Sequence, residues 1–300
     1  MRFRAPVPDD APAVIDVLTA RELADLGVRV YTLEDLRDEW SLSDFNLATD
    51  AVVVEADDQR IVGYAIARSP GAFVVVAPQD EGRGIGAVLL PWAERREREL
   101  GHDRHRQWVA ASNTRGRDFL LAAGYRLERS YWRMARALEG VVEPVRPPSG
   151  FELRPLDVDG DAAALHALDQ SSFSANADFR QETFEEFRDE HLGAHDLDAG
   201  LSLVARHGEA YAGFLLARRW GDQGVGFVDI LAVHPDHQRR GLGSSLLRAA
   251  FHRFAAAGLR DAALGVASDN PRALGLYEGV GMTARHRFDT YERPMSAGAT

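Results

Sequence analysis

The sequence predicts an α/β fold in two tandem domains, each a mixed, mostly antiparallel sheet with helices on both faces. Three observations lead to this prediction: an internal repeat, a β-hairpin pattern in each half, and a stretch rich in proline and glycine between the halves. The chain has 300 residues, of which 45% are hydrophobic, so it can bury two cores.

An internal repeat relates the two halves residue by residue. Six positions of the first half recur in the second at one constant separation, and no gap is needed. The pairs are Pro78 and Pro235, Gly84 and Gly241, Gly86 and Gly243, Gly101 and Gly258, Asn113 and Asn270, and Gly124 and Gly281. Upstream, the segment 32–39 also matches the segment 183–190. Two matches in the same order indicate a duplicated domain, and the period is too long for a solenoid.

The segment between the two copies, 138–150, is rich in proline and glycine. It shows neither a helical nor a strand period, which is typical of a linker. We therefore expect a first domain at 1–140, a linker at 141–149 and a second domain at 150–300.

Each half opens with the same order of elements. A short strand is followed by helices that start at aspartates, and then by two apolar runs joined by turn residues, which indicates a β-hairpin. The expected strands are 3–5, 51–55 and 61–67 in the first half, and 151–154, 201–205 and 212–217 in the second.

The second half continues with a strand–loop–helix unit and then a strand–helix unit. Apolar residues at helical spacing, glycines at helix ends and an Asn-Pro helix start define these elements. We expect a strand at 227–233, a helix from Gly243 to about Gly258, a strand at 264–267, a helix that begins at Asn270-Pro271 and ends near Gly279 or Gly281, and a last strand at 283–291.

The loop Gln238-x-x-Gly241-x-Gly243 is the most informative motif. Its two glycines let the backbone approach a ligand with N–H groups outward, and the following helix adds its N-terminal amides and positive dipole end. A Walker loop would need a following Gly-Lys-Ser/Thr, and a dinucleotide fingerprint would need a third glycine; neither is present. The loop therefore predicts a site for an anion such as a pyrophosphate.

With a strand before it and a helix after it, this loop resembles the acyl-coenzyme A loop of the GCN5-related N-acetyltransferase (GNAT) family. Asn270 and Tyr277 match a second family motif, in which an asparagine contacts the coenzyme arm and a tyrosine lies beside its sulfur. The tandem arrangement is similar to that of mycothiol synthase-type members. The resemblance implies two GNAT-type domains in an enzyme that transfers acetyl from acetyl-CoA, as co-substrate, to the amine of a small molecule by direct attack.

The resemblance also implies which residues hold the coenzyme. Backbone amides of the loop, helped by Arg239 and Arg240, would bind the pyrophosphate. Backbone N–H groups at 231–233 would stabilise the charge that develops on the thioester oxygen, if the strand bulges away from its neighbour. The expected coenzyme-binding residues are Leu231, Ala232, Val233, His237, Gln238, Arg239, Arg240, Gly241, Leu242, Gly243, Ser244 and Asn270.

Two side chains are candidates for proton transfer. A phenol has a pKa of about 10 and a thiol of about 8.5, so Tyr277 could protonate the leaving thiolate; the alternative is a core aromatic. Asp229, inside an apolar strand, could accept the proton of the amine, although the family commonly places this acid two residues earlier, where this chain has Phe227. The alternative for Asp229 is an ion pair with a nearby arginine.

The first half lacks this chemistry. Glu81 replaces the glutamine of the loop and would repel a pyrophosphate, Leu120 replaces the tyrosine, and Ala72 replaces the aspartate. We interpret the first half as a degenerate copy and the second as the catalytic domain.

Composition bounds the remaining possibilities. The chain has no cysteine, and the two histidines beside Pro235 lack a further ligand at suitable spacing, so no metal is expected. A formal net charge of −11 argues against nucleic-acid binding. No apolar run is long enough to span a membrane and no signal segment opens the chain, so we expect a cytoplasmic protein, monomer or homodimer, whose partner is a small-molecule amine. The alternatives are a non-catalytic acyl-CoA-binding or sensing protein and a protein N-terminal or lysine acetyltransferase.

Overall fold

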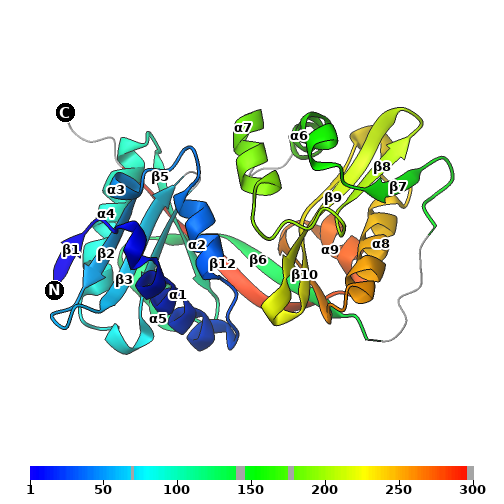
Figure 1. Ribbon diagram of the computed structural model, residues 1–300. Helices are drawn as coiled ribbons and strands as arrows, with labels where there is room; N and C mark the ends of the chain where they lie inside the picture. The colour runs from blue at the N-terminus through cyan, green and yellow to red at the C-terminus, as the bar shows by residue number, and fades with distance from the viewer. Residues whose placement is uncertain (69–70, 140–145, 175–178, 296–300) are drawn as a thin grey trace. The chain divides into compact units, whose positions relative to one another are not determined.

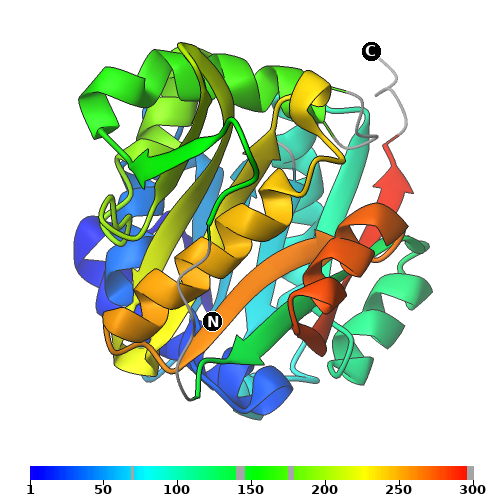
Figure 2. The ribbon, with the colours of Figure 1, turned by 90° about the vertical axis from the view of Figure 1, so that its right-hand side faces the viewer.

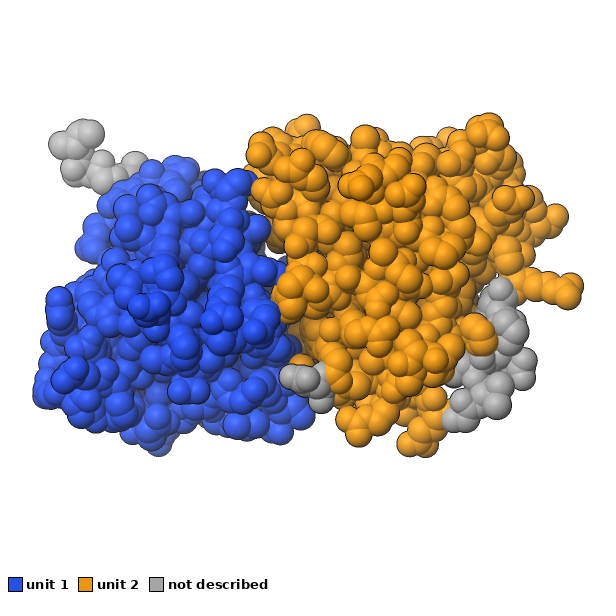
Figure 3. Space-filling view, viewed as in Figure 1, with its two compact units in different colours: residues 1–131, 286–300 blue, residues 132–285 orange. Residues whose placement is uncertain are grey.

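The computed structural model describes residues 1–68, 71–139, 146–174 and 179–295 (Figure 1). It divides into two compact units, shown in different colours in Figure 3. Unit 1 comprises Met1–Tyr131 and His286–Thr300, and unit 2 comprises Trp132–Arg285. These bounds differ from the expected 1–140 and 150–300, because two long strands, β6 (Arg126–Ala137) and β12 (Thr283–Pro294), each run through a unit boundary. Residues 141–145 of the expected linker lie outside the described residues.

Unit 1 is built on one mixed sheet with the strand order β1-β2-β3-β4-β5-β12. Neighbouring strands are antiparallel except β4 and β5, which are parallel. Besides parts of β6 and β12, the strands are β1 (Arg2–Arg4), β2 (Ala51–Glu55), β3 (Ile61–Arg68), β4 (Gly71–Val76) and β5 (Arg104–Ala110). The helices are η1 (Pro8–Asp10), α1 (Ala11–Leu26), α2 (Leu33–Trp40), α3 (Leu47–Asp50), η2 (Pro78–Asp80), α4 (Ile85–Glu99) and α5 (Thr114–Ala122).

Unit 2 repeats this plan with the strand order β11-β10-β9-β8-β7. Only β10 and β11 are parallel among these neighbours. The strands are β7 (Glu152–Pro155), β8 (Leu203–His207), β9 (Ala210–Trp220), β10 (Val225–Val233) and β11 (Asp261–Ala267). The helices are α6 (Val158–Phe173), α7 (Phe184–Phe187), the π-helical η3 (Arg188–Leu192), η4 (Gly221–Gln223), η5 (Pro235–His237), α8 (Leu242–Ala256) and α9 (Pro271–Gly279).

Alternation along the strands gives each sheet two apolar faces. In unit 1, Val53 and Tyr64 pack in a cluster with α1 and α2, whereas Val52 and Ala65 pack in another cluster with α4. In unit 2, one face packs against α8, which Figure 2 shows lying along the sheet, and the other against α6 and α7. The predicted fold class, a mixed, mostly antiparallel sheet with helices on both faces, is therefore confirmed in both units.

The local predictions around the loop also agree with the structure. The side chain of Asn270 caps α9 by accepting a hydrogen bond from the backbone N–H of Ala273, at 3.0 Å. The helix that follows the loop, α8, ends at Ala256, two residues before the left-handed Gly258. Among the described residues, no helix is long and apolar enough to cross a membrane, and no group of three or more His, Cys, Asp or Glu side chains could hold a metal ion.

Candidate active site

The site begins where β10 and β11 separate. The ladder between β10 and β9 continues to Val233, but the parallel ladder between β10 and β11 ends at the pair Val228 and Leu264. A register shift between Val228 and Ile230 places a β-bulge at Asp229. The bulge that the oxyanion hypothesis requires is therefore present, and beyond it one edge of β10 is open toward β11.

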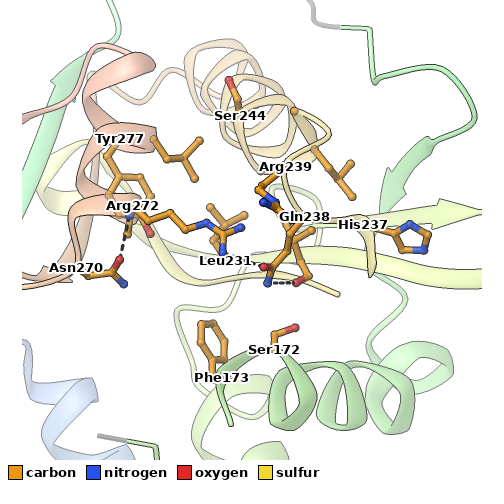
Figure 4. Close-up of a pocket in the computed structure, with 16 residues that line it drawn as sticks. Ser172, Phe173, Leu231, His237, Gln238, Arg239, Ser244, Asn270, Arg272 and Tyr277 are labelled. Carbon is orange, nitrogen blue, oxygen red and sulfur yellow. Dashed lines mark hydrogen bonds between the residues drawn. The ribbon is translucent and has the colours of Figure 1, made fainter. Parts of the chain in front are cut away.

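A cavity of about 370 Å³ lies at this opening (Figure 4). It is lined by the loop, the first turn of α8, the start of α9 and the end of α6. The lining residues are Ser172, Phe173, Leu231, Val233, His237, Gln238, Arg239, Gly241, Leu242, Gly243, Ser244, Asn270, Arg272, Ala273, Leu276 and Tyr277.

Two glycines shape the wall of the cavity at the start of α8. Gly241 has φ of 80°, a left-handed conformation that residues with a Cβ rarely adopt. A Cβ on Gly243 would lie 3.3 Å from the Cδ2 atom of Leu276, which is tighter than ordinary contact. The first residues of α8 line the cavity, and the first amides of a helix have no partner within the helix, which suits a bound anion.

Arg239 also has a left-handed backbone, with φ of 59°. Its counterpart in the internal repeat is Gly82, with φ of 75°, and Gly84 matches Gly241 with φ of 81°. The two loops thus share one backbone conformation, but the second places a cationic side chain where the first has a glycine. Strain of about 1–3 kcal/mol is typical of such a residue and tends to persist at functional sites.

The side chain of Gln238 ties the loop to two other elements. Its Nε2 atom donates to the carbonyl oxygen of Val233 on β10 at 3.1 Å, and its Oε1 atom accepts from Arg272 on α9 at 2.9 Å. Arg272, which sequence reasoning missed, therefore lines the site. The repeat carried a signal for it, because Arg115 of unit 1 pairs in the same way with Glu81, at 3.1 Å.

Tyr277, on α9, lines the cavity, and Figure 4 shows it on the same side as Asn270 and Arg272. Burial raises the pKa of its phenol to about 12. The phenol therefore stays protonated at neutral pH and can donate a hydrogen bond into the cavity.

Two of the expected coenzyme contacts do not line the cavity with their side chains. Ala232 is 1% exposed and packs with the α6 cluster, because strand alternation turns it away from Leu231 and Val233. The guanidinium of Arg240 lies over the ring of Phe151, 4.7 Å from its centroid, instead of entering the cavity. The other ten expected residues do line it: Leu231, Val233, His237, Gln238, Arg239, Gly241, Leu242, Gly243, Ser244 and Asn270.

The structure pairs Asp229 with a histidine and an arginine. Its carboxylate accepts hydrogen bonds from His191 Nδ1 at 3.0 Å and from Arg218 Nη2 at 3.1 Å. Burial alone would raise the pKa of this carboxyl, but these two partners outweigh burial and lower the pKa to about 2. A carboxylate this acidic and this fully engaged is a poor base, so the geometry fits the ion-pair alternative and not the base role.

His191 is correspondingly cationic. Burial opposes its protonation, but hydrogen bonds to Asp229 and Glu182 outweigh burial and raise its pKa to about 10. The pair joins η3 to the bulge of β10, so these charges hold the bulge in place.

Ser172 and Phe173 complete the cavity on the side facing Gln238 and Arg239 (Figure 4). They are the last two residues of α6. No motif singles out these two residues, since they come from a helix end far from the loop in sequence.

Comparison with known proteins decides the family. A family model described as acetyltransferase (GNAT) family matches residues 20–125 and again residues 162–282. The chain belongs to the GNAT family. Both matches fall where the internal repeat places its copies, so the GNAT chain is a tandem one.

Relatives and solved structures agree with this assignment. Mycothiol acetyltransferase of Geodermatophilus obscurus is 32% identical over 258 residues, covering 79% of this chain and 80% of that protein. Mycothiol acetyltransferase of Streptomyces avermitilis is 30% identical, covering 79% and 77%. A GCN5-related N-acetyltransferase from Sphaerobacter thermophilus superposes with a TM-score of 0.79 at 25% identity, covering 98% of this chain and 95% of that one. A tandem GNAT protein from the clavulanic acid biosynthesis pathway gives 0.76 at 16% identity, covering 98% of each chain, a likeness of fold alone.

GNAT enzymes use acetyl-CoA, and this GNAT protein is an N-acetyltransferase. The cavity suits that co-substrate, because loop amides and Arg239 provide an anion site beside apolar walls at Leu231 and Val233. In unit 1 the loop position of Gln238 is held by Glu81, which pairs with Arg21 and Arg115.

Proposed function

We propose that unit 2 transfers acetyl from acetyl-CoA to the amine of a small molecule by direct attack. The observation that carries this proposal is one cavity that joins an anion-binding helix start, an open strand edge and a protonated phenol. The amine nitrogen forms a bond to the thioester carbon, and the carbon–sulfur bond breaks. Amides at the open edge of β10 stabilise the carbonyl oxygen as it gains charge.

Tyr277 donates its phenolic hydrogen bond to the departing sulfur. With a pKa of about 12, full transfer to a thiolate of ordinary basicity would be uphill. The same burial raises the pKa of a thiol held beside it, because desolvation disfavours both anions. The phenol therefore stabilises the thiolate and supplies its proton as the product leaves. The proton that the nitrogen loses on becoming an amide passes to water, and the phenol regains a proton from water.

We assign the proton of the attacking ammonium to water. None of the described residues that line the cavity is a carboxylate, and Asp229 is held by His191 and Arg218. An alkyl amine then reacts in its neutral form, which is a minor fraction at neutral pH. The reaction rate is expected to rise with pH along the titration of the acceptor amine.

The relatives' name makes the unacetylated form of mycothiol the first acceptor to test. The experiment is thiol release from acetyl-CoA with that amine, simpler primary amines, a peptide with a free N-terminus and a lysine peptide, with products identified by mass spectrometry. We expect turnover with a small amine and none with peptides. Turnover with peptides alone would indicate a protein acetyltransferase, and acetyl-CoA binding without any turnover would indicate a sensor.

A further inference from the structure

Unit 1 contains another cavity, of about 260 Å³, which has no part in the reaction proposed for unit 2. It lies among α1, α2, β3 and β4, and none of its lining residues belongs to the glycine loop of unit 1 at 81–86. Its apolar wall is formed by Leu18, Ile66, Phe73 and Val75. A space of this kind, with a few polar groups on an apolar wall, has the general form of a small-molecule site.

Two hydrogen-bond donors at this cavity are buried and unused. Tyr64 is 1% exposed, and its hydroxyl accepts the indole N–H of Trp40 at 2.9 Å, while its own O–H has no acceptor among the described residues. The Nε–H of Arg21 is also buried without a hydrogen-bond partner among them. Each buried, unsatisfied donor costs about 1–3 kcal/mol, so a ligand that accepts from both would be favoured.

The same cavity is also lined by two carboxylates, which accept hydrogen bonds. The carboxylate of Glu22 accepts the backbone N–H of Val30 at 2.8 Å, and the carboxylate of Glu39 accepts the hydroxyl of Tyr31 at 2.9 Å. Burial and the charge of Glu39 raise the pKa of Tyr64 well above its usual value, so its hydroxyl is a neutral donor at any working pH. The cavity thus presents donors and carboxylates together.

We propose that this cavity binds a small amphipathic zwitterion of amino-acid size. The carboxylate of the ligand accepts from Tyr64 and Arg21, its ammonium lies toward Glu22 and Glu39, and its apolar side chain packs on the remaining wall. An anion without an ammonium would face two carboxylates uncompensated, and an amine without a carboxylate would leave both buried donors unsatisfied.

Calorimetric titration without acetyl-CoA tests this proposal independently of acetyl transfer. The probes are L-phenylalanine and L-leucine, each compared with the amine that lacks its carboxylate and the acid that lacks its ammonium. We expect each amino acid to bind at least about tenfold more tightly than either analogue. Each analogue lacks one charged group, so its complex leaves hydrogen-bonding groups of the cavity without a partner. Absence of binding by both amino acids, or equal affinity of an analogue, would overturn the proposal.

Two variants place the binding in the cavity. Tyr64→Phe should weaken it about tenfold, and Val75→Phe should abolish it by filling the space. The matched control is Tyr125→Phe, since Tyr125 is also a buried tyrosine of unit 1 but bonds to Glu94 outside the cavity. Near-ultraviolet circular dichroism verifies that each variant is folded. If a folded Val75→Phe protein binds as the unchanged protein does, the cavity is not the site.

Discussion

Arg239 distinguishes the loop of unit 2 from the equivalent loop of unit 1. Its backbone takes the left-handed conformation that unit 1 gives to Gly82, although only glycine adopts it without strain. The side chain of Arg239 lines the cavity of unit 2. Under the proposed function, its contact with an anionic ligand offsets the backbone strain.

This leads to a prediction for Arg239→Gly. The variant should be at least as stable to heat as the unchanged protein, because the strain is relieved, yet bind acetyl-CoA about tenfold more weakly, because a charged contact is lost. Thermal denaturation and calorimetric titration measure the two effects. Arg240→Ala is the control, because Arg240 lies over the ring of Phe151. The affinity of this variant for acetyl-CoA should change less. Equal losses in both variants would mean that the position of Arg239 is not special.

Also at the residue scale, we assign proton donation to the departing sulfur to Tyr277. Tyr277→Phe removes one hydroxyl that acts only as the sulfur departs, so kcat should fall about a hundredfold while the Kd of acetyl-CoA stays within about twofold. Steady-state thiol release and calorimetry give the two numbers. Tyr211→Phe, which removes a hydroxyl bonded to Asp161 outside the cavity, should leave kcat unchanged. A weaker Kd with an unchanged kcat would make Tyr277 a structural residue.

At the scale of elements, the site depends on one irregular strand. β10 keeps its ladder with β9 to the end but leaves β11 at Val228, and the bulge at Asp229 lies where the separation begins. The bulge is fixed by His191 of η3 and Arg218 of β9, which are remote from Asp229 in sequence. A small, partly buried charge network thus links η3, β9 and β10 beside the cavity.

The Asp229→Asn variant tests this network. Because the folded-state pKa of Asp229 is lowered from 3.8 to about 2, the carboxylate contributes stability above pH 4 that is lost as the pH falls toward 2. The variant should therefore be about 2 kcal/mol less stable than the unchanged protein at pH 7, and the difference should close as the pH approaches 2. Urea denaturation over this pH range measures it.

The same variant separates stability from chemistry. If water takes the ammonium proton, the acid limb of the pH–rate profile should follow the acceptor amine and be the same in Asp229→Asn. A flattened acid limb with an unchanged free energy of unfolding would instead restore Asp229 as the base.

At the scale of the whole molecule, the features that could be predicted from the sequence are those that depend on residues close together in the chain, and the repeated fold. The cap at Asn270 and the turn at Gly241 depend on neighbours within a few residues, and the repeat located both copies of the fold. The partners of Asp229 could not be predicted, because an ion pair depends on which side of a bulged strand faces which helix. That Phe173 lines the same cavity as the glycine loop could not be predicted either, since only the folded chain brings the end of α6 to the loop.

The repeat also bears on which unit is active. Gly86 and Gly243 are equivalent positions near the start of α4 and α8. A Cβ would lie 3.4 Å from the ring of Phe119 at the first position and 3.3 Å from Leu276 at the second. A side chain added at either glycine therefore meets similar crowding, but Gly243 lines the cavity to which we assign acetyl-CoA.

Turnover of acetyl-CoA in Gly243→Val and Gly86→Val is the most direct test of catalysis in unit 2. With both variants folded by circular dichroism, Gly243→Val should lose at least about a hundredfold in kcat/KM, because a side chain blocks the approach of the ligand to the loop. Gly86→Val should retain kcat/KM within about twofold. The reverse pattern, or equal losses in the two variants, would contradict the assignment of the reaction to unit 2.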